Sequence, residues 1–121
     1  MQTKDQERAR KAYAAVVAVH NDNEENFKTH AMKFPSMVMQ CGVLQSLAYC
    51  KQKDPSGIFK QMDEWLTPML PDTAGTSIVE KISADSVTIW QYQMITREAI
   101  SFGTWLKRAS ATILAKVKTK D

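Results

Sequence analysis

Histidine is the side chain most often used for acid–base chemistry near neutral pH, and the 121-residue chain contains only two. His20 follows the first expected helix, a position where an imidazole can cap carbonyl groups and favour the helix dipole. His30 has no carboxylate or cysteine three or four residues away, so its own helix completes neither a catalytic pair nor a metal site. We therefore expect a structural or solvent-exposed role for both histidines.

Carboxylates come next, because metal-dependent nucleases bring two or more of them together on divalent cations. The acidic clusters in the sequence are Asp22 with Glu24 and Glu25, and Asp63 with Glu64. Adjacent helical positions diverge by about 100°, so Asp63 and Glu64 do not converge on one ion unaided. The first cluster opens an expected helix, where negative charge complements the dipole. We predict no metal site and no cofactor.

Cys41 and Cys50 are nine residues apart on what the pattern predicts to be one apolar helix, about 13.5 Å along its axis and too far for a disulfide. Neither a glycine-rich phosphate loop, nor a Gly-x-Ser-x-Gly motif, nor a Cys-x-x-Cys pair occurs. Unpaired thiols and a charged N-terminus without an apolar signal segment indicate a reducing cytoplasm. The chain is predicted to be a binding or assembly module and not an enzyme, with a small helical enzyme as the weakest alternative.

The composition favours helices around one core, with 44% apolar and 24% charged residues and only four glycines and four prolines. No stretch of about eighteen apolar residues occurs, so no membrane contact is expected. We predict one all-α domain over residues 1–121, a compact bundle of five to six helices with a long C-terminal helix. Proline is tolerated in a first turn but not inside a helix, so Pro35 is expected to open a helix whose interior contains Gly42. The expected helices span 2–19, 24–33, 35–51, 57–66, 77–82 and 86–118.

Apolar residues at steps of three and four predict which sides of the two terminal helices are buried. The long helix is expected to begin at Asp85-Ser86 and to bury Ile95, Ala99, Phe102, Leu106, Ala109, Ile113 and Val117. Its opposite side carries Arg97, Ser101, Thr104, Arg108 and Thr112. In the first helix the inward stripe is Ala9, Ala12, Tyr13, Val16 and Val19, with Ala15 on the outer side. The tryptophans could stack on bases, but packing is the default on an apolar stripe; they are Trp65, Trp90 and Trp105.

Three segments of the sequence resemble segments of one known family. Residues 34–49 read FPSMVMQCGVLQSLAY and resemble the FPSMI-x-x-x-G-L-x-x-T-L-A-F helix of the small-subunit family of type III-B CRISPR (Cmr) effector complexes. Residues 96–109 read TREAISFGTWLKRA and resemble its more specific T-x-E-A-L-x-F-x-x-W-L-K-R-F-A segment. Residues 8–13, RARKAY, resemble its opening helix. The order and spacing of these segments agree, so the resemblance covers most of the chain.

The resemblance implies a non-catalytic, all-helical antiviral-defence protein that stacks in several copies beside other Cmr subunits, the guide RNA and the target RNA. The net charge of +3 is concentrated in the terminal helices, which weakly indicates a polyanionic partner. Arg97 and Arg108 are three helical turns apart, about 16 Å, which spans two or three phosphates. Solvated faces and ion pairs with neighbouring helices are the competing interpretation, and a purely structural spacer is the alternative function. The predicted RNA-contacting residues are Lys4, Arg8, Lys11, Lys28, Lys33, Arg97, Lys107 and Arg108.

Overall fold

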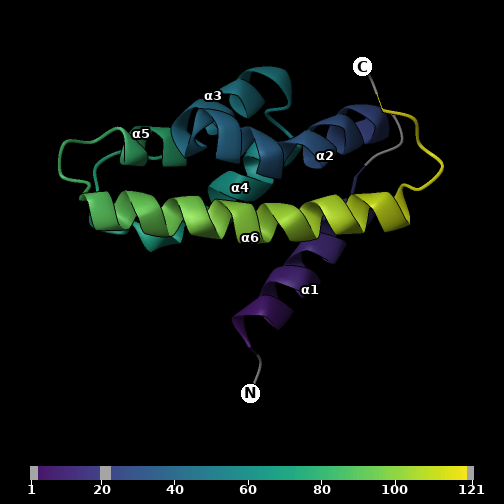
Figure 1. The fold of residues 1–121 in the computed structure, drawn as a ribbon, viewed down its shortest axis with the longest axis horizontal. Coiled ribbons are helices and arrows are strands. Elements are labelled where there is room, and N and C mark those ends of the chain that lie inside the picture. Colours follow the sequence, from purple (N-terminus) through teal and green to yellow (C-terminus); the bar gives the residue numbers. More distant parts are fainter. Residues whose placement is uncertain (1–2, 20–22, 120–121) are drawn as a thin grey trace.

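The computed structural model describes residues 3–19 and 23–119, which fold into six α-helices and one 3-10 turn (Figure 1). The helix α6 runs along the longest axis of the molecule, with α2, α3 and α5 on one side of it and α1 inclined across the other. The predicted all-α bundle with a long C-terminal helix is therefore confirmed. No helix within the described ranges is long and apolar enough to cross a membrane. The elements are α1 (Lys4–Val17), α2 (Glu24–Cys41), α3 (Val43–Lys53), α4 (Ile58–Leu66), η2 (Thr67–Met69), α5 (Ile78–Ile82) and α6 (Ile89–Ile113).

A capping box starts α6 three residues later than expected. The Thr88 hydroxyl accepts the Gln91 amide at 3.1 Å, and the Gln91 side chain accepts the Thr88 amide at 2.8 Å, which satisfies two free donors of the first turn. The helix ends at Ile113 and not at Lys118, with Leu114 as its C-cap. Five residues of the expected apolar stripe are at most 1% exposed: Ile95, Ala99, Phe102, Leu106 and Ala109.

The expected helix boundary at Pro35 is wrong, because α2 continues through this proline to Cys41. Pro35 is buried in the interior of α2, so packing of its ring accompanies the loss of one backbone hydrogen bond. The break falls instead at Gly42, whose φ of 86° and ψ of 160° are open essentially only to glycine. Gly42 thus separates α2 from α3, which the apolar pattern joins into one expected helix.

Small residues bring the helices close to α6. A Cβ on Gly103 of α6 would lie 2.9 Å from the ring of Phe34, so α2 approaches α6 closely at that glycine. On α1 the buried residues are Ala12, Ala15 and Val16. Two predictions for α1 are therefore wrong, because Ala15 faces the core while Tyr13 is 36% exposed. Compact side chains let α1 pack tightly, and the larger Tyr13 ring lies at the rim.

Candidate nucleic-acid interface

The outward side of α6 is a continuous stripe of residues at steps of four and three, which we call the α6 outer face. Ser101 and Thr104 are partly buried along it, and its cations Arg97 and Arg108 are exposed and lie about 16 Å apart along the axis. From Trp90 to Arg108 the stripe extends about 27 Å. Its members are Trp90, Met94, Arg97, Ser101, Thr104, Arg108 and Thr112.

A shallow groove of about 290 Å³ lies on this face, where the start of α1 meets the second half of α6. The indole Nε1 of Trp105 donates to Asp5 Oδ1 at 2.8 Å, which fixes the orientation of the ring. The guanidinium of Arg108 lies 5.7 Å from the ring centroid of Trp105. The groove therefore combines an oriented aromatic ring, a cation and hydroxyl groups; its lining is Asp5, Ile100, Ser101, Thr104, Trp105 and Arg108.

Arg8 of α1, one of the predicted RNA-contacting residues, is partly buried in a contact with Glu98. Its Nε donates to Glu98 Oε2 at 2.6 Å and its Nη2 donates to Glu98 Oε1 at 2.7 Å. Trp65 Nε1 donates to Glu98 Oε2 at 2.8 Å, so α1, α4 and α6 meet at one carboxylate. Burial raises the pKa of Glu98, but the hydrogen bonds from Arg8 and Trp65 and the charges of Arg8 and Lys4 outweigh it, so this pKa lies below its ordinary value. The same hydrogen bond to Glu98 raises the pKa of Arg8 above its ordinary value.

Lys28 is engaged as well, because its Nζ donates to the carbonyls of Leu114 at 2.9 Å and Val117 at 2.8 Å. It thereby binds carbonyl groups at the C-terminal end of α6. The Lys4 amine lies 5.0 Å from the ring centroid of Trp65. The Lys11 amine lies 3.9 Å from Glu64 Oε2 in a solvent-exposed pair.

The remaining predicted cations project from two different helices. Arg97 and Arg108 on α6 are exposed and Lys107 beside them is partly buried, while Lys33 is exposed on α2. The structure thus brings Arg97 and Arg108 onto one face and places Lys33 elsewhere. Local spacing predicts Arg8 and Lys28 to be surface cations. It does not reveal the contacts that occupy them, because these contacts join residues 90 and 86 positions apart in the sequence.

The potentially reactive groups of His30, Cys50 and Asp63 are buried or hydrogen-bonded within the fold. His30 is 6% exposed and its Nδ1 donates to the Asn26 carbonyl at 2.8 Å; His20 lies outside the described residues. Burial and then the Asp54 charge raise the pKa of Cys50 to about 12, which keeps this thiol protonated. Asp63 Oδ1 accepts the Ile78 amide at 2.6 Å, which ties α4 to the start of α5. Among the described residues no three His, Cys, Asp or Glu side chains are placed to hold a metal ion.

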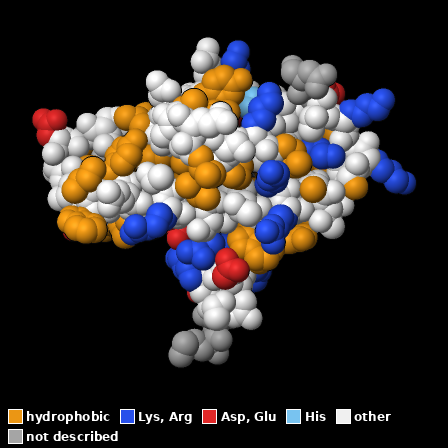
Figure 2. Space-filling view, viewed as in Figure 1, with side chains coloured by type: hydrophobic (Ala, Val, Ile, Leu, Met, Phe, Trp, Pro, Cys, Tyr) orange, Lys and Arg blue, Asp and Glu red, His pale blue; other side chains and the backbone are white. Residues whose placement is uncertain are grey.

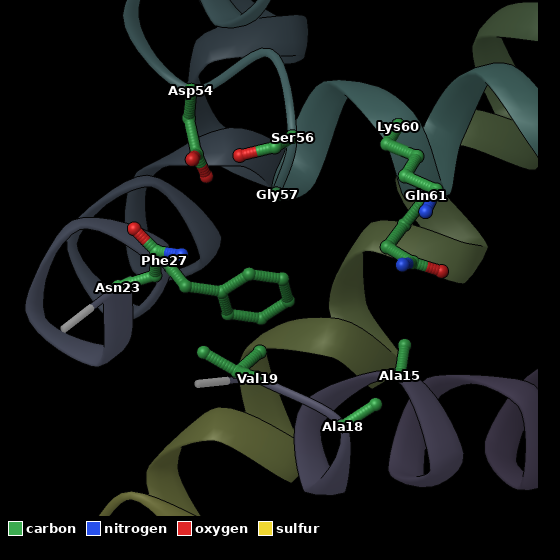
Figure 3. Close-up of a pocket in the computed structure, with 10 residues that line it drawn as sticks. All are labelled: Ala15, Ala18, Val19, Asn23, Phe27, Asp54, Ser56, Gly57, Lys60 and Gln61. Carbon is green, nitrogen blue, oxygen red and sulfur yellow. The ribbon is translucent and has the colours of Figure 1, made fainter. Parts of the chain in front are cut away.

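A second pocket, of about 260 Å³, lies between α1, α2 and the start of α4 (Figure 3). Figure 3 shows apolar side chains from the end of α1 and the residues just after it, with the Phe27 ring, on one side of the pocket, and Asp54 with Ser56 on the other. Asp54 is 4% exposed and already accepts the Ile58 amide at 2.9 Å and the Asn26 amide group at 3.1 Å. The Asp54 carboxylate in this pocket is therefore already hydrogen-bonded within the fold, at the start of α4.

Apolar side chains are exposed at the start of α6. Trp90 is 74% exposed, Ile89 67% and Met94 38%, although core packing is the default expectation for Trp90. Figure 2 shows hydrophobic side chains concentrated over the half of the molecule where α6 begins, and most Lys and Arg side chains over the middle and other half. The exposure of Trp90 could have been predicted from helical spacing, because Trp90 precedes Ile95 by five residues and lies about 140° around the helix from the buried stripe.

The fold and this face define a class of protein, an all-α bundle that presents one side of a long helix to solvent. Residues 4–113 match the family model described as CRISPR-associated protein (Cas_Cmr5), so the chain belongs to the Cmr5 family. This confirms the resemblance to the small subunits of type III-B CRISPR (Cmr) complexes. The chain is 26% identical over 117 residues to the CRISPR system Cmr subunit Cmr5 of Thermus thermophilus, covering 94% of this chain and 98% of that protein. An X-ray crystal structure of a CRISPR-associated Cmr5 family protein from the same organism matches with a TM-score of 0.72 at 27% identity, covering 94% of this chain and 99% of that one.

Proposed function

We propose that this protein is a non-catalytic small subunit of a cytoplasmic type III-B CRISPR effector complex in antiviral defence, and that it contacts guide or target RNA. The observation that carries RNA contact is the alignment of Arg97 and Arg108 on the α6 outer face. Two cations about 16 Å apart on a rigid helix match the spacing of two or three phosphates. Phosphate contacts of this kind position RNA without reading its sequence.

The eight predicted cations contribute unequally to this proposal. The main proposed RNA contacts are Arg97, Arg108 and the neighbouring Lys107. Lys4, Lys11 and Lys33 remain secondary contacts, because each amine lies at the surface. Arg8 and Lys28 would first have to give up charge-assisted hydrogen bonds inside the protein, so they contribute least.

Stacking of several copies beside other Cmr subunits is the second part of the proposal. The exposed cluster of Ile89, Trp90 and Met94 supports it, since large apolar side chains at a surface favour protein–protein contact. Such stacking would join weak RNA sites through effective concentration, while one copy alone would bind RNA weakly. The same cluster favours the alternative function, a purely structural spacer that joins subunits without touching RNA.

RNA binding at two ionic strengths separates these functions. The parent chain should bind a single-stranded RNA weakly and without sequence preference, and higher salt should weaken the binding strongly. In Arg97→Ala/Arg108→Ala the slope of log affinity against log salt should fall by about 0.7 for each phosphate that the protein no longer neutralises. The matched control is Lys53→Ala/Lys60→Ala, which removes two exposed cations from α3 and α4.

Circular dichroism should show unchanged helicity in both double variants. If the arginine variant assembles and binds RNA like the control, the α6 outer face is not an RNA contact and the structural spacer is the better description. Tight, salt-insensitive binding by the parent chain would also contradict the proposed phosphate contacts.

A further inference from the structure

The groove beside Trp105 lies between the two arginines of the α6 outer face. Ser101 and Thr104 line it and are four and seven residues after Arg97, on the same side of the helix. Arg108 and Asp5 of α1 also line the groove. An RNA strand that follows α6 from Arg97 to Arg108 therefore passes over this groove.

The chemistry of the groove suits a nucleobase better than a phosphate. The carboxylate of Asp5 repels phosphate, and its side chain is 64% exposed, so it can accept hydrogen bonds from ring and amino N–H groups. The Trp105 indole and the Arg108 guanidinium are planar groups of the kind on which bases stack in protein–RNA complexes. At about 290 Å³ the groove is slightly smaller than the usual small-molecule site, roughly 300–1,000 Å³, which suits one base and not a longer ligand.

The aromatic wall of the groove is already oriented before any ligand binds. The hydrogen bond from Trp105 Nε1 to Asp5 Oδ1 holds the indole, and Arg8 Nη1 lies 3.5 Å from the same Asp5 oxygen. Arg8 is in turn fixed by Glu98. A preorganised wall reduces the conformational entropy lost on binding.

We propose that this groove binds one unpaired nucleobase of the RNA, with Trp105 and Arg108 as stacking surfaces and with Ser101 and Asp5 as polar contacts to the base edge. This inference rests on the proposed RNA contact of the α6 outer face and adds a site for the base to a site for the phosphates. It also predicts that affinity depends on the presence of bases and not only on charge.

The test compares two RNA strands of equal length, one with all its bases and one abasic, which carries the same phosphates. The parent chain should bind the base-bearing strand at least about fivefold more tightly at the same ionic strength. Ser101→Leu fills the groove on a partly buried helix position without changing charge, and it should remove this difference. Thr112→Leu, on the same face beyond the groove, is the matched control and should retain it.

Tryptophan fluorescence gives an independent measurement. The base-bearing strand should quench the emission of the parent chain more than that of Trp105→Phe, and the abasic strand should quench neither. Trp105→Phe retains a ring for stacking, so its fold is checked by circular dichroism before the comparison.

Each alternative result has a distinct meaning. Equal affinity for both strands would overturn the base site and leave the proposed phosphate contacts standing. A base preference that survives in Ser101→Leu would place the base elsewhere and overturn this groove. Loss of subunit assembly in Ser101→Leu with unchanged RNA binding would make the groove a protein contact, and absence of binding to either strand would overturn both proposals.

Discussion

Arg8 and Glu98 form a two-point ion pair that joins the first helix to the last. Both carboxylate oxygens of Glu98 accept from the guanidinium, at 2.6 and 2.7 Å, across 90 positions of sequence. The Arg8 side chain is 18% exposed and that of Glu98 is 8% exposed, so solvent screens this pair less than a surface pair. Trp65 adds a third hydrogen bond, which makes Glu98 the junction of α1, α4 and α6.

The first prediction concerns the loss of one partner of this pair. Arg8→Ala should lower the free energy of unfolding by about 1–3 kcal/mol, because it leaves the Glu98 carboxylate largely buried with one hydrogen bond from Trp65. Urea denaturation followed by circular dichroism measures this change. The matched control is Lys11→Ala, which removes an exposed amine 3.9 Å from Glu64 and should change the same quantity by less than about 1 kcal/mol. Equal effects of both substitutions would show that the Arg8–Glu98 pair stabilises the fold no more than the exposed Lys11–Glu64 pair does.

The second prediction follows from the lowered pKa of Glu98. In the unfolded chain this carboxyl has its ordinary, higher pKa, so at a pH between the two pKa values the unfolded chain binds more protons than the folded one. The stabilisation is therefore fully present above the unfolded-state pKa and is lost as pH falls through the folded-state pKa. The groups facing the carboxylate are Arg8, Lys4 and Trp65, with Asp5 on the far side of Arg8.

Glu98→Gln tests this pH dependence, because the amide cannot titrate. The difference in unfolding free energy between the parent chain and Glu98→Gln should shrink as the pH is lowered from about 6 towards about 3. Glu64→Gln is the control, since its carboxylate is half-exposed and should give a difference that is small at every pH. If the difference between the parent chain and Glu98→Gln stays constant over this range, the assigned cause is contradicted.

Hydrophobic periodicity was sufficient to predict the helical fold and most of the buried side of α6. It failed where one backbone position decided the outcome. A proline rule placed a boundary at Pro35, whereas packing kept α2 continuous and the positive φ of Gly42 made the break. The position of Tyr13 suits the apolar stripe of α1, but the close approach of helices in the structure favours the smaller Ala15.

The candidate interface was predictable only in part for a related reason. Helical spacing alone placed Arg97 and Arg108 on one outward face, because both belong to the same helix. The groove also needs Asp5, which lies 100 positions before its hydrogen-bond partner Trp105. The periodicity of a single helix gives no information about contacts between residues so far apart in the sequence. Neither the groove nor the contact of Arg8 with Glu98 could therefore be inferred from spacing.

The third prediction tests the glycine that separates α2 from α3. Gly42→Ala should lower the free energy of unfolding by about 1–3 kcal/mol, because its φ of 86° and ψ of 160° are strained for any residue with a Cβ. Space is not the cause, since the nearest atom to the added Cβ would be the Tyr92 hydroxyl at an ordinary 3.7 Å. Gln45→Ala on the exposed side of α3 is the control and should change stability by at most about 0.5 kcal/mol. A stability of Gly42→Ala equal to that of the parent chain would mean that α2 and α3 can join without cost.

The last prediction separates a structural from an RNA-binding role for Lys28. Lys28→Met retains an apolar stem but removes the donor to the carbonyls of Leu114 and Val117, so the turn after α6 should open more often. Hydrogen exchange should accelerate at the Leu114 and Val117 amides, which donate to Ser110 and Leu114. The control is Lys33→Met, an exposed lysine of the same helix, whose exchange at these amides should match the parent chain. Because the Lys28 amine is already engaged, the salt dependence of RNA binding should change less in Lys28→Met than in Arg97→Ala/Arg108→Ala. The opposite pattern, unchanged exchange with weakened RNA binding, would show that Lys28 releases these carbonyls to bind phosphate.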